Sequence, residues 1–524
     1  MGVFQRLLPL LYIPTVLWCA GPDAWIPARW QGGPLEVARR VQLKTAPAVG
    51  PEQEALENWY DPSTLRLLEG SPINCLLVTW SAGSDRDLIR RQQEVVKSYT
   101  GLARQQGAAV IGVVYPGPNA AEAATSAAAA GLDGLALDGD FPADFAAQAA
   151  RALAGRPVIP IFQVAPAART SSAPLLGVEG VSPRARNLAD MGIRSAPSSE
   201  PWIESNIWLV RSFRLRPGAW HPVWISYETE DATPADYPLF AADAAIAGGR
   251  WLVNLNDKFR AALRARDAAA LAAWQRTGDV LRFAEEHAAW RDFSPFAALA
   301  LIVDPASAQA DMGEEYLKLV TRRQTPYRPI LRSSLTAATL AGFRAVLATE
   351  LAPPTPAERQ MLTAFAENGG VVIAGPSWGN APKGEDQPYA EQPQGKGRVV
   401  VYRDPDPESV ARDLRDTLAQ AERGVTVFNV PGVITYASSA DSGISPKSAP
   451  GSPAQVSGRC VLLQLLNYSS SPADDITVRV SGSFTSARLF APGAAPAKLQ
   501  IGSAQGRTEV AIPRIALWGA LLLE

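Results

Sequence analysis

Acidic residues follow several apolar stretches of this chain, and their positions point to chemistry performed by carboxyl groups. The acids at these ends are Asp138, Asp140, Glu179, Glu228, Glu230 and Asp257. Two carboxyl groups can cleave a glycosidic bond, because one protonates the leaving oxygen while the other attacks the sugar or activates water. We take Asp138, Glu179 and Glu228 as candidate catalytic residues. Each could instead cap the helix that follows its strand.

The sequence lacks the residues that other hydrolytic mechanisms need. His221 and His287 are the only histidines, and neither lies near a cysteine or the other histidine in the sequence. A histidine zinc site and a Ser-His-Asp triad are therefore not expected. We predict no cofactor and no metal, although the turn after Asp138 could also be interpreted as an aspartate-rich calcium loop.

Aromatic and polar residues near the same ends are candidates for binding sugar. Aromatic faces stack on pyranose rings, and carboxylates or amides bind hydroxyl groups, although aromatic residues at strand ends are about as often core. The candidates are Trp80, Tyr115, Asp140, Trp202, Glu204, Asn206, Tyr227 and Asp257.

The elements that would position these residues alternate between apolar strands and helices. Seven apolar stretches between Ile73 and Asp257 are predicted strands, most of them separated by helical segments. Strands that are apolar throughout indicate a parallel sheet covered on both faces, and a TIM-like (β/α)8 barrel is its natural closure. We predict this barrel for residues 22–290. The region Trp25–Tyr60 supplies the eighth strand, or the barrel is incomplete.

Two further patterns follow the barrel. Residues 291–422 predict a flavodoxin-like or amidotransferase-like α/β domain, with a helix capped by Thr355 and Glu358 and ended by Asn368-Gly369-Gly370. Residues 423–524 contain short alternating strands separated by turn residues, which predict an all-β sandwich.

This order of parts resembles multidomain glycoside hydrolases of the beta-galactosidase type. The residues that carry the resemblance are PAERQMLTAFAENGGVVIAGP in the middle, and LLQLLNYSSSPADDITVRV with SARLFAP near the end. The resemblance implies a catalytic barrel, a glutamine amidotransferase-like middle domain and a C-terminal β-domain. Residues 291–422 contain no Cys and no His, so the middle domain lacks the nucleophile of an amidotransferase.

The segment LDGLALDGD also resembles the chitinase-type motif, in which acidic residues alternate along a strand. Asp133, Gly134 and Asp138 match this motif, whereas Ala136 replaces an acidic position and Asp140 stands where the motif has Glu. The expected function is hydrolysis of an oligo- or polysaccharide. The alternative is a catalytically inactive carbohydrate-binding or structural surface protein of the same architecture.

The composition and the N-terminal residues bear on the partners and the cellular location of the protein. The chain has 524 residues, 47% hydrophobic and 19% charged, with a formal net charge of −2, so nucleic acid is not an expected partner. Residues 1–21 predict a signal peptide of a secreted or periplasmic protein, and Cys19 leaves a lipoprotein anchor as a minor alternative. No later stretch has the length of a membrane span. The resemblance leaves room for a homo-oligomer, although no residue requires one.

Overall fold

The computed structural model describes residues 21–142, 144–162, 176–186, 202–215, 223–307, 310–349, 351, 353–384, 386–418, 423–428, 432–440, 460–504 and 506–524. Residues 1–20 of the predicted signal peptide, which include Cys19, and His221 lie outside these ranges. In the described ranges, no helix combines the length and apolar character that crossing a bilayer requires.

A parallel sheet forms the N-terminal part of the molecule, and it closes into a barrel. Its strands, in spatial order, are β10 (Arg250–Trp251), β9 (Val223–Ser226), β6 (Leu176–Glu179), β5 (Val158–Phe162), β4 (Gly134–Asp138), β3 (Ala109–Val114), β2 (Cys75–Ser81), β1 (Pro27–Arg29) and β11 (Val253–Asn254). β10 and β11 are separated only by Leu252, and they pair with β9 and β1 respectively. The predicted barrel is confirmed, and β1 supplies the strand that the sequence left open.

Side chains of these strands alternate between the barrel interior and the surrounding helices, as a period of two requires. Leu77, Ile111 and Trp224 belong to the interior core, whereas Leu76 and Val110 pack in the outer layer. The main surrounding helices are α1 (Gly33–Gln42), α3 (Arg86–Gln105), α4 (Ala120–Ala130), α5 (Phe145–Ala152), α6 (Ile207–Arg214), α7 (Tyr237–Ile246), α8 (Asp257–Arg264) and α9 (Ala268–Glu286). Helix α2 (Pro51–Glu57) and the hairpin of β7 (Arg184–Arg186) and β8 (Trp202–Glu204) lie in the connections.

The middle domain is a second, smaller α/β unit. Its sheet has the order β14 (Tyr327–Leu331), β13 (Leu299–Val303), β15 (Ala345–Leu347), β16 (Val371–Ala374), β18 (Gly397–Tyr402) and antiparallel β17 (Tyr389–Gln394). The parallel strands follow the flavodoxin-like order. Helices α10 (Ala310–Arg322), α11 (Pro356–Glu367) and α12 (Pro407–Thr417) accompany them. The predicted capping box of α11 is present, because Thr355 Oγ1 accepts from Glu358 N at 3.2 Å.

The C-terminal part packs two antiparallel sheets around an apolar core. One contains β12 (Ser294–Pro295), β20 (Val433–Ala440), β21 (Cys460–Asn467), β27 (Trp518–Leu523), β23 (Ala487–Phe490) and β24 (Ala497–Lys498). The other contains β19 (Val425–Phe428), β22 (Ala473–Val480), β26 (Arg507–Ile515) and β25 (Ile501–Ala504). This is the predicted β-sandwich. β12 comes before the middle domain in the chain, yet it pairs with β20.

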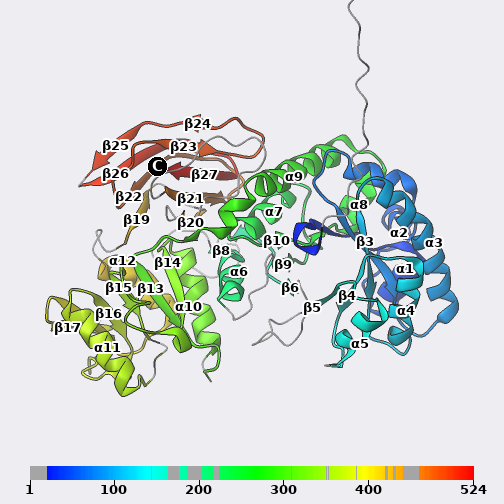
Figure 1. The fold of residues 1–524 in the computed structure, drawn as a ribbon. Coiled ribbons are helices and arrows are strands. Elements are labelled where there is room, and N and C mark those ends of the chain that lie inside the picture. Colours follow the sequence, from blue (N-terminus) through cyan, green and yellow to red (C-terminus); the bar gives the residue numbers. More distant parts are fainter. Residues whose placement is uncertain are drawn as a thin grey trace, which may run out of the picture.

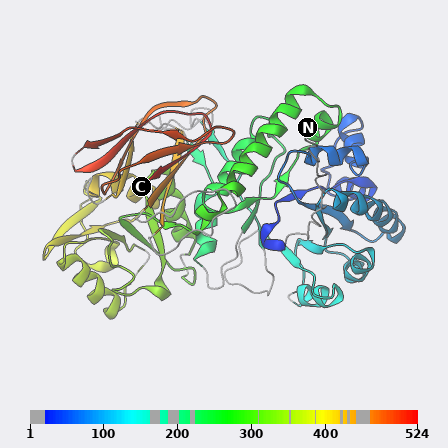
Figure 2. The ribbon, with the colours of Figure 1, turned by 45° about the horizontal axis from the view of Figure 1, so that its top comes forward.

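Figure 1 shows the barrel (blue to green) on one side and the other two units (green-yellow and red) on the other, with α9 running toward the sandwich. The turned view in Figure 2 keeps this arrangement.

Asp243 of α7 joins the barrel to the sandwich. This buried carboxylate accepts from Ser205 Oγ at 2.7 Å, Asn206 Nδ2 at 2.9 Å, Tyr227 Oη at 3.2 Å and Tyr468 Oη at 2.5 Å. These donors replace the water that burial removes.

Candidate active site at the carboxyl ends of the barrel strands

The alternation of side chains places polar groups inside the barrel mouth, where the strands end. Val113, Ala136 and Trp224 belong to the interior core, so Tyr115, Asp138 and Ser226, two residues later, point to the same side. Ala28 and Val178 pack in the outer layer. The neighbouring Arg29 and Glu179 therefore point inward. The carboxyl ends of parallel barrel strands carry the active sites of this type of fold.

Arg29 is the centre of this polar group. Its Nη1 donates to Asp138 Oδ2 at 2.6 Å, and its Nε donates to Ser226 Oγ at 3.3 Å. Burial alone would lower the pKa of Arg29, but the charges of Asp138 and Glu179 outweigh burial and raise it. One guanidinium thus links the ends of β1, β4 and β9 and also attracts the carboxylate at the end of β6.

Glu179 lies among like charges. Partial burial raises its pKa, Arg29 opposes this, and the charges of Glu228 and Asp138 raise it further. In the sheet, β6 lies beside β9 and two places from β4, so the side chains at these strand ends share one arc of the mouth. The structure therefore brings Asp138, Glu179 and Glu228 together, as expected for residues that end β4, β6 and β9.

Glu228 lies two residues beyond β9, with its side chain exposed to solvent. The backbone carbonyl of Glu228 accepts a hydrogen bond from Ser182 Oγ, which ties the loop after β9 to the loop after β6. β4 and β9 are three places apart in the sheet. Asp138 and Glu228 therefore lie at the two ends of one arc of the mouth, with Glu179 between them.

Among the predicted sugar-binding residues, Tyr115, Asp140 and Asp257 lie at or beside the mouth. The Tyr115 hydroxyl accepts from Gln31 Nε2 at 2.6 Å, and its ring lies under the Arg39 guanidinium at 4.0 Å. Asp140 is exposed just beyond β4. Asp257 begins α8, and both of its carboxylate oxygens accept from Arg40 Nη1 at 3.0 Å.

Trp80, Tyr227 and Asn206 are buried away from the mouth. Trp80 belongs to the outer layer, where its indole donates to Ala123 O at 3.0 Å. Tyr227 and Asn206 both donate to Asp243. These contacts give the three residues packing and interdomain positions, with no face left for a sugar ring.

Trp202 and Glu204 lie on β8, outside the barrel wall. The guanidinium of Arg322, from α10 of the middle domain, lies 3.3 Å from the centre of the Trp202 ring. Glu204 forms an ion pair with Arg184 at 2.6 Å across the hairpin. Trp202 therefore contacts the middle domain, and the structure does not bring Trp202 or Glu204 to the mouth.

Sequence reasoning missed Arg29, Arg39 and Arg40. The sequence PAR (Pro27–Arg29) could have indicated them, because it lies at the start of Trp25–Tyr60, the region in which no strand was assigned. A three-residue strand is too short for its periodicity to be recognised. Had Pro27–Arg29 been assigned as a strand, Arg29 would have been a strand-end residue like the acids.

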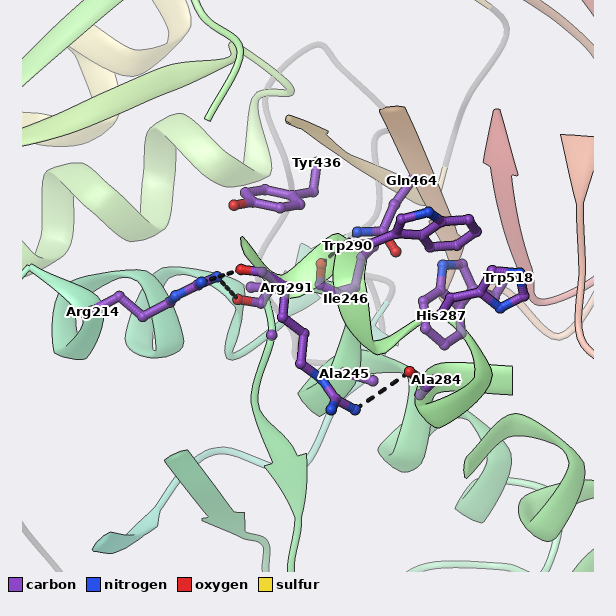
Figure 3. A pocket seen from close by; sticks show the side chains of 12 residues that line it. Arg214, Ala245, Ile246, Ala284, His287, Trp290, Arg291, Tyr436, Gln464 and Trp518 are labelled. Carbon is purple, nitrogen blue, oxygen red and sulfur yellow. Dashed lines mark hydrogen bonds between the residues drawn. The ribbon is translucent and has the colours of Figure 1, made fainter. Parts of the chain in front are cut away.

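Two hollows away from the mouth have no carboxyl group in their lining, so neither offers the pair that glycoside hydrolysis needs. Figure 3 shows a cavity of about 20 Å³ between the barrel and the sandwich, where Arg214 points toward the carbonyls of Ala247 and Arg291. His287, the C-cap residue of α9, lies beside Trp290 in the same figure. The volume suits about one water molecule. A hollow of about 460 Å³ on the middle domain, beside α11, has no carboxylate in its lining.

The barrel, the flavodoxin-like domain and the sandwich follow one another in an architecture similar to that of solved multidomain glycoside hydrolases. No protein-family model matches the sequence, and no curated protein matches it. Alpha-L-fucosidase isoenzyme 2 from Paenibacillus thiaminolyticus is similar over 88% of this chain and 96% of its own, with a TM-score of 0.58 and 10% identity. A catalytic mutant of Gan42B, a GH42 beta-galactosidase from G. stearothermophilus, is similar over 95% and 98%, with a TM-score of 0.52 and 8% identity. The likeness at these identities is one of fold.

Proposed function

We propose that this chain is a glycoside hydrolase that cleaves an oligo- or polysaccharide with carboxyl groups at the barrel mouth. The observation that carries the proposal is the position of Arg29, which forms an ion pair with Asp138 and attracts Glu179. The charge of Glu228 acts on Glu179 in turn. Glycoside hydrolysis needs one carboxyl group that holds a proton and another that is ionised. A site that raises the pKa of one carboxyl group above the pKa of its neighbour supplies both forms.

In this proposal, Glu179 is the general acid. Partial burial and the charges of Glu228 and Asp138 raise its pKa, which favours the protonated form that donates to the leaving oxygen. Asp138 is the ionised partner, because its ion pair with Arg29 orients a charged carboxylate. Asp138 then attacks the anomeric carbon or takes a proton from the attacking water. Glu228 acts through its charge on Glu179.

Tyr115 and Asp140 remain our candidates for sugar contact, Tyr115 through its ring and hydroxyl and Asp140 through its exposed carboxylate beyond β4. Asp257 acts indirectly in this proposal, because its carboxylate is bound to Arg40. We also propose the division into residues 22–290, 291–422 and 423–524, in which β12 of the second segment adds an edge strand to the sandwich. Residues 1–21 are the basis for proposing an extracytoplasmic location. N-terminal sequencing of the exported protein tests the predicted cleavage.

The test is hydrolysis across a panel of aryl glycosides and polysaccharides. Wild type is compared with Asp138→Asn, Glu179→Gln and Glu228→Gln, and with Glu230→Gln, an exposed acid two residues from Glu228, as the matched control. Turnover that is lost by orders of magnitude in Asp138→Asn and Glu179→Gln, but retained in Glu230→Gln, supports the proposal. Equal turnover in all variants contradicts it.

A carbohydrate-binding scaffold without activity is the second candidate. The observation that favours it is the Arg29–Asp138 ion pair, which engages one carboxylate before any substrate arrives. Binding of a glycan by wild type, with no turnover on the whole panel, would support the scaffold over the enzyme.

A further inference from the structure

Beside the carboxylates, the mouth carries a second group of charges, which we call the arginine cluster: Glu36, Arg39, Arg40, Asp257 and Arg260. It joins α1, which follows β1, to α8, which follows β11. Arg39 Nη2 and Arg40 Nε both donate to Glu36 Oε1, at 2.6 Å and 2.9 Å. Two guanidinium groups therefore lie against one carboxylate oxygen.

Glu36, which both Arg39 and Arg40 contact, is fully buried. Thr79 Oγ1 of β2 donates to Glu36 Oε2 at 2.9 Å. Burial alone would raise the pKa of Glu36, but Arg39 and Arg40 outweigh it and lower this pKa to about 2. Glu36 is therefore ionised across the physiological range, and its charge is already shared between two cations.

The cluster has more positive than negative charge. Arg39, Arg40 and Arg260 are cations, whereas Glu36 and Asp257 are the anions bound to them. Arg260 is only 1% exposed, and its Nε and Nη1 have no hydrogen-bond partner in the described part of the chain, with Asp257 Oδ1 3.9 Å from Nη1. Burial and the charge of Arg40 lower the pKa of Arg260 to about 10, so it remains a cation at neutral pH. A buried excess charge is costly, and a bound anion would offset it.

The excess charge reaches solvent at the mouth. The Arg39 and Arg40 side chains are 20% and 17% exposed. Within the part of the chain that the structure describes, Arg39 Nη1 and Arg40 Nη2 have no hydrogen-bond partner, because the other nitrogens make the contacts with Glu36 and Asp257. Arg39 also lies over the ring of Tyr115, whose hydroxyl is at the mouth. The open guanidinium nitrogens thus lie one aromatic ring away from the proposed catalytic carboxylates.

We propose that the arginine cluster binds the anionic group of an acidic sugar, a carboxylate or a sulfate ester. The inference rests on the proposed function and names its substrate class. The carboxylates at the ends of β4, β6 and β9 form one side of the mouth, and the cluster above β1 and β11 forms the other. A charged sugar would be held by Arg39 and Arg40, with its neutral glycosidic bond beside Glu179 and Asp138. Guanidinium forks bind carboxylates and sulfates with charge-assisted hydrogen bonds.

The test measures binding by titration calorimetry in the Glu179→Gln background, so that turnover does not interfere. The probes are oligouronates with their neutral methyl esters, and sulfated galactan oligosaccharides with their desulfated forms. We expect an acidic form to bind at least about tenfold more tightly than its neutral partner, with a preference that falls as salt is raised. The pair that shows the preference distinguishes a carboxylate ligand from a sulfate ligand.

Variants locate the effect. Arg39→Gln should remove the preference for the acid, Arg39→Lys should keep part of it, and Arg90→Gln, an exposed arginine on α3, should leave it unchanged. Equal binding of acidic and neutral forms by the Glu179→Gln protein, or no binding of any acidic form, overturns the inference even if Arg39→Gln fails to fold. A preference that survives in folded Arg39→Gln also overturns it.

Hydrolysis is scored separately with the Glu179-containing enzyme. Turnover of neutral glycans alone leaves the hydrolase standing and overturns the acidic-sugar inference. Binding of acidic glycans that the enzyme never cleaves supports the acidic-sugar inference and contradicts the proposed hydrolase activity.

Discussion

Arg29 Nη1 lies 2.6 Å from Asp138 Oδ2, although 109 residues separate the two along the chain. Their strands, β1 and β4, are three places apart in the barrel sheet, so the ion pair crosses part of the mouth. Because the same guanidinium attracts Glu179, one side chain affects both proposed catalytic groups.

Replacing Arg29 should move the pH dependence of hydrolysis. The positive charge of Arg29 lowers the pKa of Glu179, so Arg29→Gln should raise that pKa further. A rate that needs protonated Glu179 falls as pH rises through this pKa, and the basic limb of kcat/KM should therefore shift to higher pH. The overall rate should also fall by about tenfold or more, because Asp138 loses its orienting partner. Arg90→Gln is the control, and an unmoved basic limb would contradict the assignment.

The effect of replacing Glu179 with a residue that cannot donate a proton should depend on the leaving group of the substrate. Glu179→Gln should lower kcat by about 10²–10⁴-fold on natural glycosides. On dinitrophenyl glycosides the loss should be much smaller, because that leaving group departs without protonation. A uniform loss on both substrates would assign Glu179 another role. Glu230→Gln, measured in parallel, should behave as wild type.

The contact between Tyr468 and Asp243 should stabilise the docked sandwich. Tyr468→Phe deletes one donor to a buried carboxylate and should lower the free energy of unfolding by about 1–3 kcal/mol. Urea denaturation measures this change. Tyr389→Phe is the matched control, because the Tyr389 hydroxyl makes no hydrogen bond in the described part of the chain. Equal stability of the two variants would show that Tyr468 does not hold the sandwich.

Trp80 should affect stability without selective effects on sugar binding. Its side chain is 1% exposed, so Trp80→Ala leaves a cavity in the outer layer and should cost about 3–5 kcal/mol. Denaturation gives the cost, and calorimetry at a temperature where the variant is folded gives the affinity for glycan. A large loss of affinity in a variant of normal stability would return Trp80 to the list of sugar-binding residues.

Much of the fold could be predicted from the sequence, because long apolar strands alternate with helices and leave a strong pattern. The strands from Cys75 to Asn254, the flavodoxin-like order and the sandwich all follow from that pattern. β1 did not, because three residues carry no usable periodicity. Closure of the barrel therefore depended on tertiary pairing of Ala28 with Leu76 and Val253.

The site was harder to predict, since strands buried on both faces do not show which side of the sheet a side chain takes. Asp138 and Trp80 both end apolar strands, yet Asp138 faces the barrel interior and Trp80 faces α4. The partners of the acids were also invisible, because Arg29 and Arg40 meet Asp138 and Asp257 only after the barrel closes. Strand ends therefore indicated where chemistry could occur, and the inward or outward direction of each side chain decided which residues could take part.

The pairing of β12 with β20 has a consequence for how this chain can be cut and rejoined. The backbone leaves the sandwich after Pro295 and re-enters it at Val425, and Gly424 lies against the backbone of Ala298. The middle domain is thus an insertion whose entry and exit touch. A short linker in its place would keep the barrel and sandwich continuous, whereas separating the chain into halves at residues 422–423 would remove the edge strand β12 from its sheet.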